Sequence, residues 1–156
     1  MGCGKNLNPF TPTTQQVLAE SHREARRLCS PHLSSEHILL GVVAFGQGIA
    51  ATVLVQAGLQ VEVLRNHLET VGWTREPVSV NGFGLSARIL LASAERHTHA
   101  LSHSSVCPEH IVLGLLDEPA SGTVGRAIAH FGIDVRATRQ AIINRISPRS
   151  PSRPSA

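Results

Sequence analysis

Residues Ser34 to Gly41 spell Ser-Ser-Glu-His-Ile-Leu-Leu-Gly, and residues Cys107 to Gly114 spell Cys-Pro-Glu-His-Ile-Val-Leu-Gly. Each copy opens with a pair of small or turn-forming residues, continues with Glu-His, and then runs apolar to a glycine. An acidic residue in a first turn complements the helix dipole, and a run that is apolar on every face is typical of a buried helix. The two copies therefore predict two equivalent buried helices.

The start of each copy also predicts how its helix is capped. We expect Ser34 and Cys107 at the N-cap positions, immediately before the first helical residue. Pro108 suits the first helical position, where its missing N–H costs nothing. Glu36 and Glu109 then fall in the first turns.

The match between the two halves of the chain extends well beyond this motif. Aligned pairs are Phe10 with Phe83, Val17-Leu18 with Leu90-Leu91, Leu28 with Leu101 and, after one extra residue near Pro119, Gly48 with Gly122, Gly58 with Gly132 and Leu68 with Ile142. Repeats that cannot bury their apolar faces alone pack on each other. We therefore predict an all-α fold: a tandem pseudo-twofold repeat of two four-helix motifs that forms one compact helical domain.

Helical spacing and turn residues divide the chain into segments. In the first half, helices are predicted over residues 13–28, 35–44, 49–56 and 60–71. The predicted domain covers residues 10–146, with a first repeat at 10–71, a linker at 72–82 and a second repeat at 83–146. Residues 1–9 are expected to be a flexible lead-in. Residues 147–156, built from Ser, Pro, Arg and Ala, cannot form a core and are expected to be disordered.

The composition indicates which residue types form the core and which class of partner is excluded. Aromatic residues make up only 3% of the chain, so the core must be aliphatic. The net charge is +3, and two of the arginines lie in the last ten residues. The densest basic cluster, Arg23, Arg26 and Arg27, is interrupted by Glu20 and Glu24, which indicates a solvated helix face with local charge pairs. We therefore expect no nucleic-acid partner.

The cysteines and the apolar runs indicate the compartment. Cys3, Cys29 and Cys107 are an odd and sparse set, which argues against a disulfide framework and for a reducing environment. No apolar run reaches membrane length, and the first residues lack the apolar region of a signal peptide. The expected location is the cytoplasm, with no membrane partner.

The two halves together resemble the N-terminal domain of the Clp/Hsp100 unfoldases, most closely the ClpC type. The resemblance covers residues 10–146. The matching motifs are the opening Phe10-Thr11, the Glu-Ala-Arg-Arg-Leu of Glu24 to Leu28, the Glu-His motifs of Ser35 to Gly41 and Pro108 to Gly114, and the Gly-Ile-Ala-Ala helix of Gly48 to Gly58.

The resemblance implies a binding module rather than an enzyme. In the family, ATPase modules follow this domain, and a P-loop needs Gly-x-x-x-x-Gly-Lys-Ser/Thr. The one lysine, Lys5, is followed by Asn6 and has no room for that loop. We expect a stand-alone or excised Clp N-domain without cofactor, which binds client proteins or Clp ATPase and protease components. The alternative is a decoy that sequesters cyclic peptide antibiotics directed at ClpC N-domains.

The resemblance further implies that Glu36 and Glu109, with Thr11, bind phosphoarginine on client proteins. A carboxylate pairs well with the planar fork of a guanidinium; the alternative is that each glutamate only complements its helix dipole. Thr11 is expected to lie near Ser35 and Glu36. Gly84 and Pro108 replace the family's threonines, so the first copy is the better candidate of the two.

Three large apolar residues are further candidates for binding. Phe10 and Phe83 stand at equivalent repeat starts, and Leu18 lies on the first helix. They either complete the core or form the wall of a groove near the pseudo-twofold axis. The resemblance implies that this region holds apolar peptides and cyclic peptide antibiotics.

The histidines raise a zinc-dependent enzyme as a third hypothesis. His99 and His103 are one helical turn apart, and His97, Cys107 and His110 are close in sequence. His97 and His99 align with Glu24 and Arg26, expected on the surface, so we predict exposed or loop histidines and no metal. For His37 and His110 we predict a structural role, with a backbone or carboxylate partner.

Overall fold

The computed structural model describes residues 9–70 and 80–147, and within these ranges the regular structure is helical. The helices are α1 (Pro12–Arg27), α2 (Ser35–Phe45), α3 (Gly48–Gln56), α4 (Val61–Glu69), α5 (Leu85–Ala100), α6 (Pro108–Leu116), α7 (Thr123–His130) and α8 (Val135–Ile146). The predicted all-α tandem repeat is confirmed. The expected lead-in before Pro9, most of the linker and the tail after Ser147 lie outside the described residues.

The predicted helix starts are confirmed. Ser34 and Cys107 are the N-caps of α2 and α6, and Pro108 begins α6. Thr11 caps α1, and its side chain accepts a hydrogen bond from the backbone N–H of Thr14. The glutamate of each Glu-His motif falls in the first turn, as the sequence predicts.

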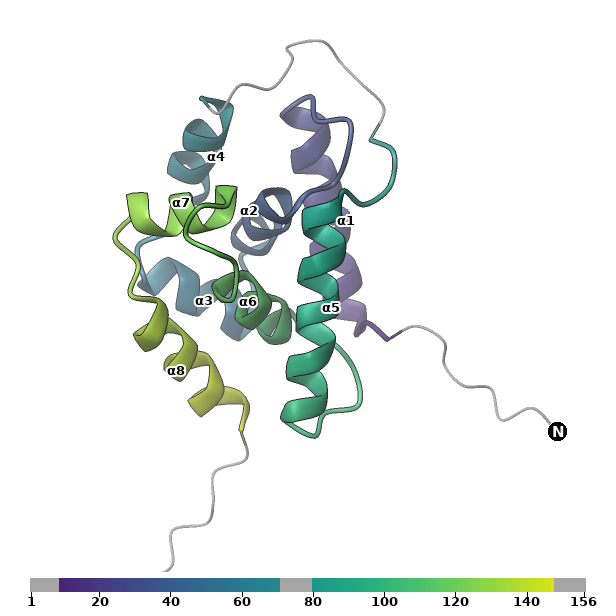
Figure 1. The fold of residues 1–156 in the computed structure, drawn as a ribbon, viewed down its shortest axis with the longest axis vertical. Helices are drawn as coiled ribbons and strands as arrows, with labels where there is room; N and C mark the ends of the chain where they lie inside the picture. Colours follow the sequence, from purple (N-terminus) through teal and green to yellow (C-terminus); the bar gives the residue numbers. More distant parts are fainter. Residues whose placement is uncertain (1–8, 71–79, 148–156) are drawn as a thin grey trace, which may run out of the picture.

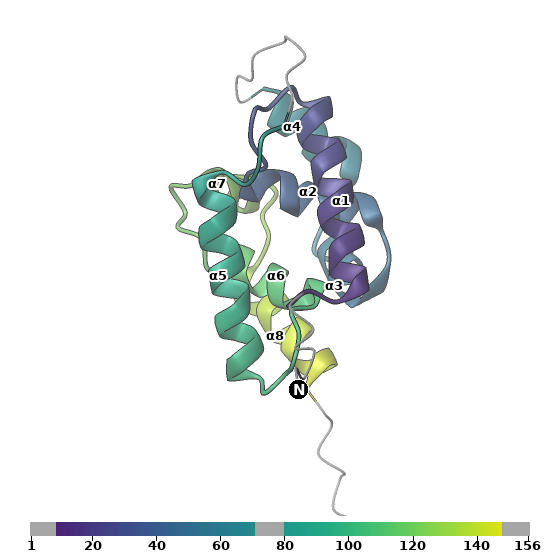
Figure 2. The ribbon, with the colours of Figure 1, turned by 90° about the vertical axis from the view of Figure 1, so that its right-hand side faces the viewer.

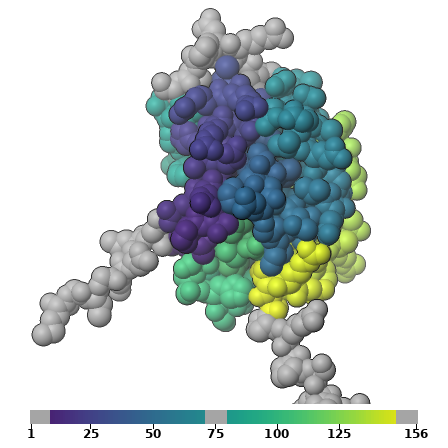
Figure 3. Space-filling view, turned by 180° about the vertical axis from the view of Figure 1, so that it is seen from behind, coloured from purple at the N-terminus to yellow at the C-terminus, as the bar shows by residue number. Residues whose placement is uncertain are grey.

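The two central helices, α2 and α6, carry the fold. α1 packs on α2, and α5 packs on α6 in the equivalent way. α1 and α5 flank this centre and run in opposite directions, so that they begin at opposite ends of the molecule (Figures 1 and 2). On the far face, α8 lies beside α3 of the other repeat (Figure 3). Each repeat therefore supports the other.

The core is aliphatic, as predicted: the fully buried large side chains among the described residues are leucines and isoleucines. Close packing depends on Gly41, where an added Cβ would lie 2.0 Å from Ser21 Oγ and 2.8 Å from Ser21 Cα.

Among the described residues, no single helix is long and apolar enough to cross a membrane; α2 and α3 pass that test only as a pair, bent by 97°.

Glu24 corrects one prediction. It was expected on a solvated face, but it is 1% exposed and accepts hydrogen bonds from Arg65 Nε at 3.1 Å and Nη2 at 2.7 Å.

In the second repeat the position of Glu24 is taken by His97, and Asp117 supplies the acid instead. Asp117 accepts from Arg139 Nη2 at 2.7 Å and also bonds His97. The expected local pair between Arg23 and Glu20 is present at 2.6 Å.

Candidate functional site

The first residues of each repeat cross onto the other repeat. The Thr11 N–H donates to the Val106 carbonyl at 3.1 Å, just before α6. In the equivalent place, the Gly84 N–H donates to the Leu33 carbonyl at 2.8 Å, just before α2. Each central helix therefore begins beside a segment from the opposite repeat.

This crossing shows that the predicted location of Thr11 is wrong. Thr11 was expected near Ser35 and Glu36, but it lies beside the start of α6, which carries Glu109. Gly84 takes the corresponding place at α2, where an added Cβ would lie 3.3 Å from Ser34 Oγ. The threonine of the opening motif thus belongs with the second Glu-His copy.

The histidine of each motif completes a cap. His37 Nδ1 accepts a hydrogen bond from the backbone N–H of Ser34 at 3.0 Å, and His110 Nδ1 accepts from Cys107 N–H at the same distance. A protonated Nδ1 cannot accept, so both rings must be neutral here. Burial lowers the pKa of both histidines to about 4. The predicted structural role is confirmed.

A first pocket, which we call the Ile89 pocket, has a volume of about 340 Å³. It lies between the start of α2, the first turns of α5 and the loop from α6 to α7. Its lining residues are Ser35, Glu36, Ser86, Ile89, Glu118, Pro119, Gly122 and Thr123. The Ser35 N–H donates to Ser86 Oγ at 3.1 Å, which ties α2 to α5 across the repeat boundary.

Two carboxylates line this pocket, and the charge of one affects the pKa of the other. Burial raises the pKa of Glu36, which is only 4% exposed, and burial and the charge of Glu36 raise the pKa of Glu118. The Ser35 hydroxyl interacts with both carboxylates, but it has one proton to donate. Glu118 Oε1 is buried and has no hydrogen-bond partner among the described residues. Over residues 9–70 and 80–147, no lysine or arginine lines this pocket.

An exposed apolar strip borders the same pocket. Leu85 is 69% exposed and Ile89 is 57% exposed, and the two side chains are one turn apart on α5. The equivalent residues of the first repeat, Pro12 and Gln16, offer no such strip. Sequence reasoning missed these residues, although the apolar Ile89 at the position of the polar Gln16 was a readable signal.

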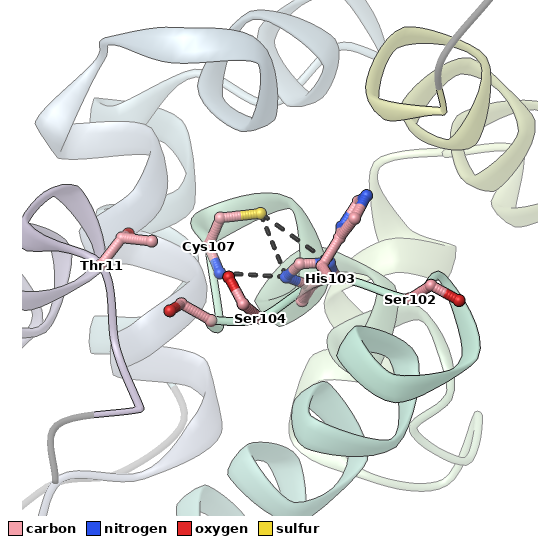
Figure 4. A pocket seen from close by; sticks show the side chains of 7 residues that line it. Thr11, Ser102, His103, Ser104 and Cys107 are labelled. Atoms are coloured by element: carbon pink, nitrogen blue, oxygen red, sulfur yellow. Dashed lines mark hydrogen bonds between the residues drawn. The ribbon is translucent and has the colours of Figure 1, made fainter. Parts of the chain in front are cut away.

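A second pocket, the Thr11 pocket, is an open depression of about 500 Å³ (Figure 4). Its lining residues are Thr11, Ser102, His103, Ser104, Ser105, Cys107 and His110. The Cys107 thiol lies 3.1 Å from His110 Nδ1, and His110 Nε2 lies 2.8 Å from His103 Nδ1. Burial and the neighbouring carboxylate of Glu109 raise the pKa of Cys107 to about 12, so this thiol is neither a ready nucleophile nor a ready metal ligand.

The hydroxyl of Thr11 serves mainly as a cap. Thr14 Oγ1 donates its proton to the Val106 carbonyl at 2.7 Å. In the 2.9 Å contact between the two threonine hydroxyls, Thr11 must therefore be the donor. Thr11 positions the pocket wall, and its proton is already engaged.

The three apolar candidates do not share one wall. Phe10 is half-buried where it bridges to Val106, and Phe83 is 42% exposed where it bridges to Leu33. These two crossings lie at opposite ends of the α1 and α5 pair (Figure 2). Leu18 is half-buried against the core.

The clustered histidines have separate partners. His97 binds Asp117, while His103 contacts His110. Over residues 9–70 and 80–147, no group of three or more His, Cys, Asp or Glu side chains is placed to hold a metal ion. This arrangement gives the zinc hypothesis no site within these ranges.

The sequence matches a known family model twice. The model for the Clp repeat N-terminal domain covers residues 9–82 and again residues 82–155. The chain belongs to this family. Its members include the chaperone ClpB of Oceanobacillus iheyensis, which is 35% identical over 86% of this chain. The match spans 17% of that relative's own length.

A second relative is ClpC/MecB of Bacillus subtilis, the negative regulator of genetic competence. It is 34% identical over 86% of this chain and 16% of its own length. The chain thus spans about a sixth of the Clp proteins it matches.

Solved Clp N-domains share the fold. The N-terminal domain of ClpD from Arabidopsis thaliana has a TM-score of 0.72 at 21% identity, over 88% of this chain and 97% of that one. A ClpV N-domain in complex with a VipB peptide has a TM-score of 0.69 at 18% identity, over 90% and 91% of the two chains.

Proposed function

We propose that this Clp N-domain is a non-enzymatic module of the Clp proteolysis system that binds segments of client proteins or of Clp ATPase and protease partners. The observation that carries the proposal is the crossing of the repeats, which builds a concave pocket beside the first turn of each central helix. A motif glutamate lies in or next to each pocket. The ClpV N-domain of the same fold is known with a bound peptide, which supports this class of function.

The Thr11 pocket is the better place for phosphoarginine. Glu109 is half-buried and interacts with Cys107 on the pocket wall, where its carboxylate can meet a guanidinium. The hydroxyls of Ser104 and Ser105 line the same pocket and supply donors for a phosphoryl group. We therefore propose the second Glu-His copy, with Thr11 as its cap, as the phosphoarginine site.

Paired peptides test this proposal. A seven-residue peptide with one phosphoarginine is titrated against the wild-type chain and against Glu109→Gln, Ser104→Ala and Glu36→Gln. We expect Glu109→Gln to weaken binding at least about tenfold, which corresponds to about 1.4 kcal/mol. Glu36→Gln should leave binding of this peptide unchanged. Equal binding by Glu109→Gln and the wild type would remove the phosphoarginine site from Glu109.

A second candidate function is a decoy for cyclic peptide antibiotics directed at ClpC N-domains. The observation in its favour is apolar surface at the predicted positions: Phe83 is 42% exposed and Leu18 is only half-buried. An apolar cyclic peptide that bound tightly to the wild type and weakly to Phe83→Ser, without binding of phosphoarginine peptides, would favour the decoy.

A further inference from the structure

We propose that a hollow between α3 and α8, which we call the α3–α8 pocket, binds the indole side chain of a tryptophan in a partner polypeptide. The pocket has a volume of about 320 Å³. Its lining residues are Val53, Gln56, Ala57, Gly132, Asp134, Ala137, Thr138 and Ala141. Among the described residues it shares no lining side chain with the Ile89 pocket or the Thr11 pocket, so this site goes beyond the function proposed above.

The first support comes from the equivalent interface between the repeats, which is filled by rings. His67 on α4 and His130 on α7 stack with their ring centroids 4.4 Å apart. Phe131 lies edge-on to both rings, with its centroid 5.5 Å from that of His67 and 5.0 Å from that of His130. Such stacked and edge-on arrangements are favourable for aromatic groups. The boundary between α4 and α7 is therefore closed by side chains of the protein itself.

The α3–α8 pocket takes the equivalent place with smaller side chains. In the alignment of the two repeats, the pairs are Gln56 with His130, Ala57 with Phe131 and Ala141 with His67. One amide and two methyl groups thus stand at the positions where the other interface has three rings. The walls of an unfilled hollow lose the dispersion contacts that a neighbouring atom would supply. An aromatic ring from outside would supply them here.

The second support is an acceptor at the edge of the pocket. Asp134 is the N-cap of α8, and its Oδ1 accepts a hydrogen bond from the Ala137 N–H at 2.9 Å. A carboxylate has two acceptor oxygens, so Oδ2 is left to accept from a ligand. The indole of tryptophan carries one N–H donor and no acceptor, and a buried indole N–H usually finds a partner. Phenylalanine would fill the hollow without using this acceptor, so tryptophan matches the pocket better.

The third support is that the walls are held in place. Val53 and Thr138 are buried, and Thr138 Oγ1 donates to the Asp134 carbonyl at 2.7 Å. Arg145 Nη2 donates to Gln56 Oε1 at 3.2 Å, which links α8 to α3 of the other repeat. The pocket is therefore pre-formed, which reduces the ordering cost of binding.

The position of the pocket separates it from the Ile89 pocket. α3 and α8 meet on the face seen in Figure 3. α5, which carries Ile89, lies on the other side of the central helices from α8 (Figure 1). Tryptophan is among the residues that contribute most to binding at protein interfaces. A tryptophan anchored between α3 and α8 would thus attach a partner and leave the Ile89 pocket open.

The test is a ¹⁵N-edited NMR titration of the full chain with the peptide acetyl-Ser-Gly-Trp-Gly-Ser-amide. Control peptides carry alanine, or 1-methyltryptophan, which lacks the N–H donor. N-acetyltryptophanamide presents the ring without a polypeptide. The variants Ala57→Phe and Ala141→His bring in the side chains that the other repeat has at Phe131 and His67. Ala92→Phe, at an exposed position on α5, is the matched control for an added ring.

We expect the amide shifts to centre on Ala57, Gly132 and Thr138. Ala57→Phe and Ala141→His should each raise the Kd at least about tenfold, because they fill the hollow from within, and Ala92→Phe should leave it unchanged. The alanine peptide should not bind, and N-acetyltryptophanamide should bind at least about tenfold more weakly than the peptide. Methylation of the indole nitrogen should raise the Kd at least about threefold.

Thermal melts that match the wild type show that the variants fold; if one of the two filled variants does not fold, the other carries the test. Absence of binding, shifts that centre elsewhere, or a Kd that neither filled variant changes would overturn the pocket assignment. Equal binding by the alanine peptide would overturn the ring, and equal binding by the methylated peptide would overturn Asp134 as the acceptor. N-acetyltryptophanamide binding as tightly as the peptide would overturn the polypeptide as the ligand. The phosphoarginine peptide is titrated separately, so these outcomes leave the function proposed above untouched.

Discussion

His37 holds the backbone of Ser34: its Nδ1 accepts the Ser34 N–H at 3.0 Å, three residues back along the chain. This is the bond that a Glu or Gln side chain makes in the usual capping box. His110 repeats it with Cys107 in the second half of the chain. The Glu-His motif is therefore divided between two tasks, since the histidine fixes the start of the central helix and leaves the glutamate available at the pocket.

Replacing His37 tests the capping role. His37→Leu leaves the Ser34 N–H without its partner, so we expect the free energy of unfolding to fall by about 1–3 kcal/mol. His37→Gln restores a capping-box acceptor and should recover part of that loss. Urea unfolding followed by circular dichroism measures both variants. Equal destabilisation by Leu and Gln would contradict the cap.

The same histidines predict an acid-sensitive fold. Their pKa in the folded chain is about 4, below the usual 6.5, so the unfolded chain binds more protons between these values. Stability should be complete above about pH 6.5 and should fall as the pH drops toward 4, by about 3 kcal/mol per histidine. The raised pKa values of Glu36 and Glu118 act in the opposite direction.

Urea titrations at pH 7, 5.5 and 4.5 check this prediction. His37→Gln/His110→Gln serves as the comparison, since it removes both titrating rings and should flatten the profile. A wild-type profile as flat as that of the double variant would show that the rings do not titrate as the geometry requires.

The two motif glycines should differ in their tolerance of alanine. At Gly41 the new Cβ would meet Ser21 Oγ at 2.0 Å and the Ser21 Cα at 2.8 Å, so backbone must move. At Gly114 the closest atom is the flexible end of Leu90, Cδ1 at 2.9 Å. We expect Gly41→Ala to cost at least about 3 kcal/mol and Gly114→Ala about 1 kcal/mol. Thermal unfolding of the two variants measures the loss of stability. Equal losses in the two variants would contradict this ranking.

The ion pairs of the two repeats should also differ in their contribution to the free energy of unfolding. Glu24 is buried and accepts two hydrogen bonds from Arg65, so Glu24→Ala leaves Arg65 with the exposed Glu62 as its remaining acidic partner and should cost about 2–3 kcal/mol. The equivalent pair of Arg139 and Asp117 is solvated, with side chains 30% and 38% exposed, and Arg139→Ala should cost at most about 1 kcal/mol. Denaturant midpoints of the two variants measure this difference; the reverse order would refute it.

The repeat made most of the fold predictable from the sequence. The helix predicted over residues 13–28 could be found because its apolar spacing fits a helix and pairs such as Leu28 with Leu101 recur in the second half. Pro108 and Ser34 located the helix starts because capping chemistry is local. Such features depend on residues a few positions apart, which a sequence displays directly.

The site was less predictable because it is formed between the repeats. Thr11 belongs to the same repeat as Ser35 and Glu36, yet the crossing places it beside α6. Glu24 looked like one member of a charged surface run, and only Arg65 on α4 makes it a buried pair. Glu118 stands in the loop that has one residue more than its counterpart, so the first repeat gave no guide to it.

The most direct test of the proposed binding site is a ¹⁵N-edited NMR titration of the wild-type chain with the phosphoarginine peptide and with the same peptide carrying citrulline. We predict that amide shifts with the phosphoarginine peptide centre on Ser104, Ser105, Cys107 and Glu109, at the Thr11 pocket. The citrulline peptide should leave these amides unshifted. Shifts that centre away from the Thr11 pocket, or no shifts with the phosphoarginine peptide, would contradict the claim that the crossing at the start of α6 is a binding site.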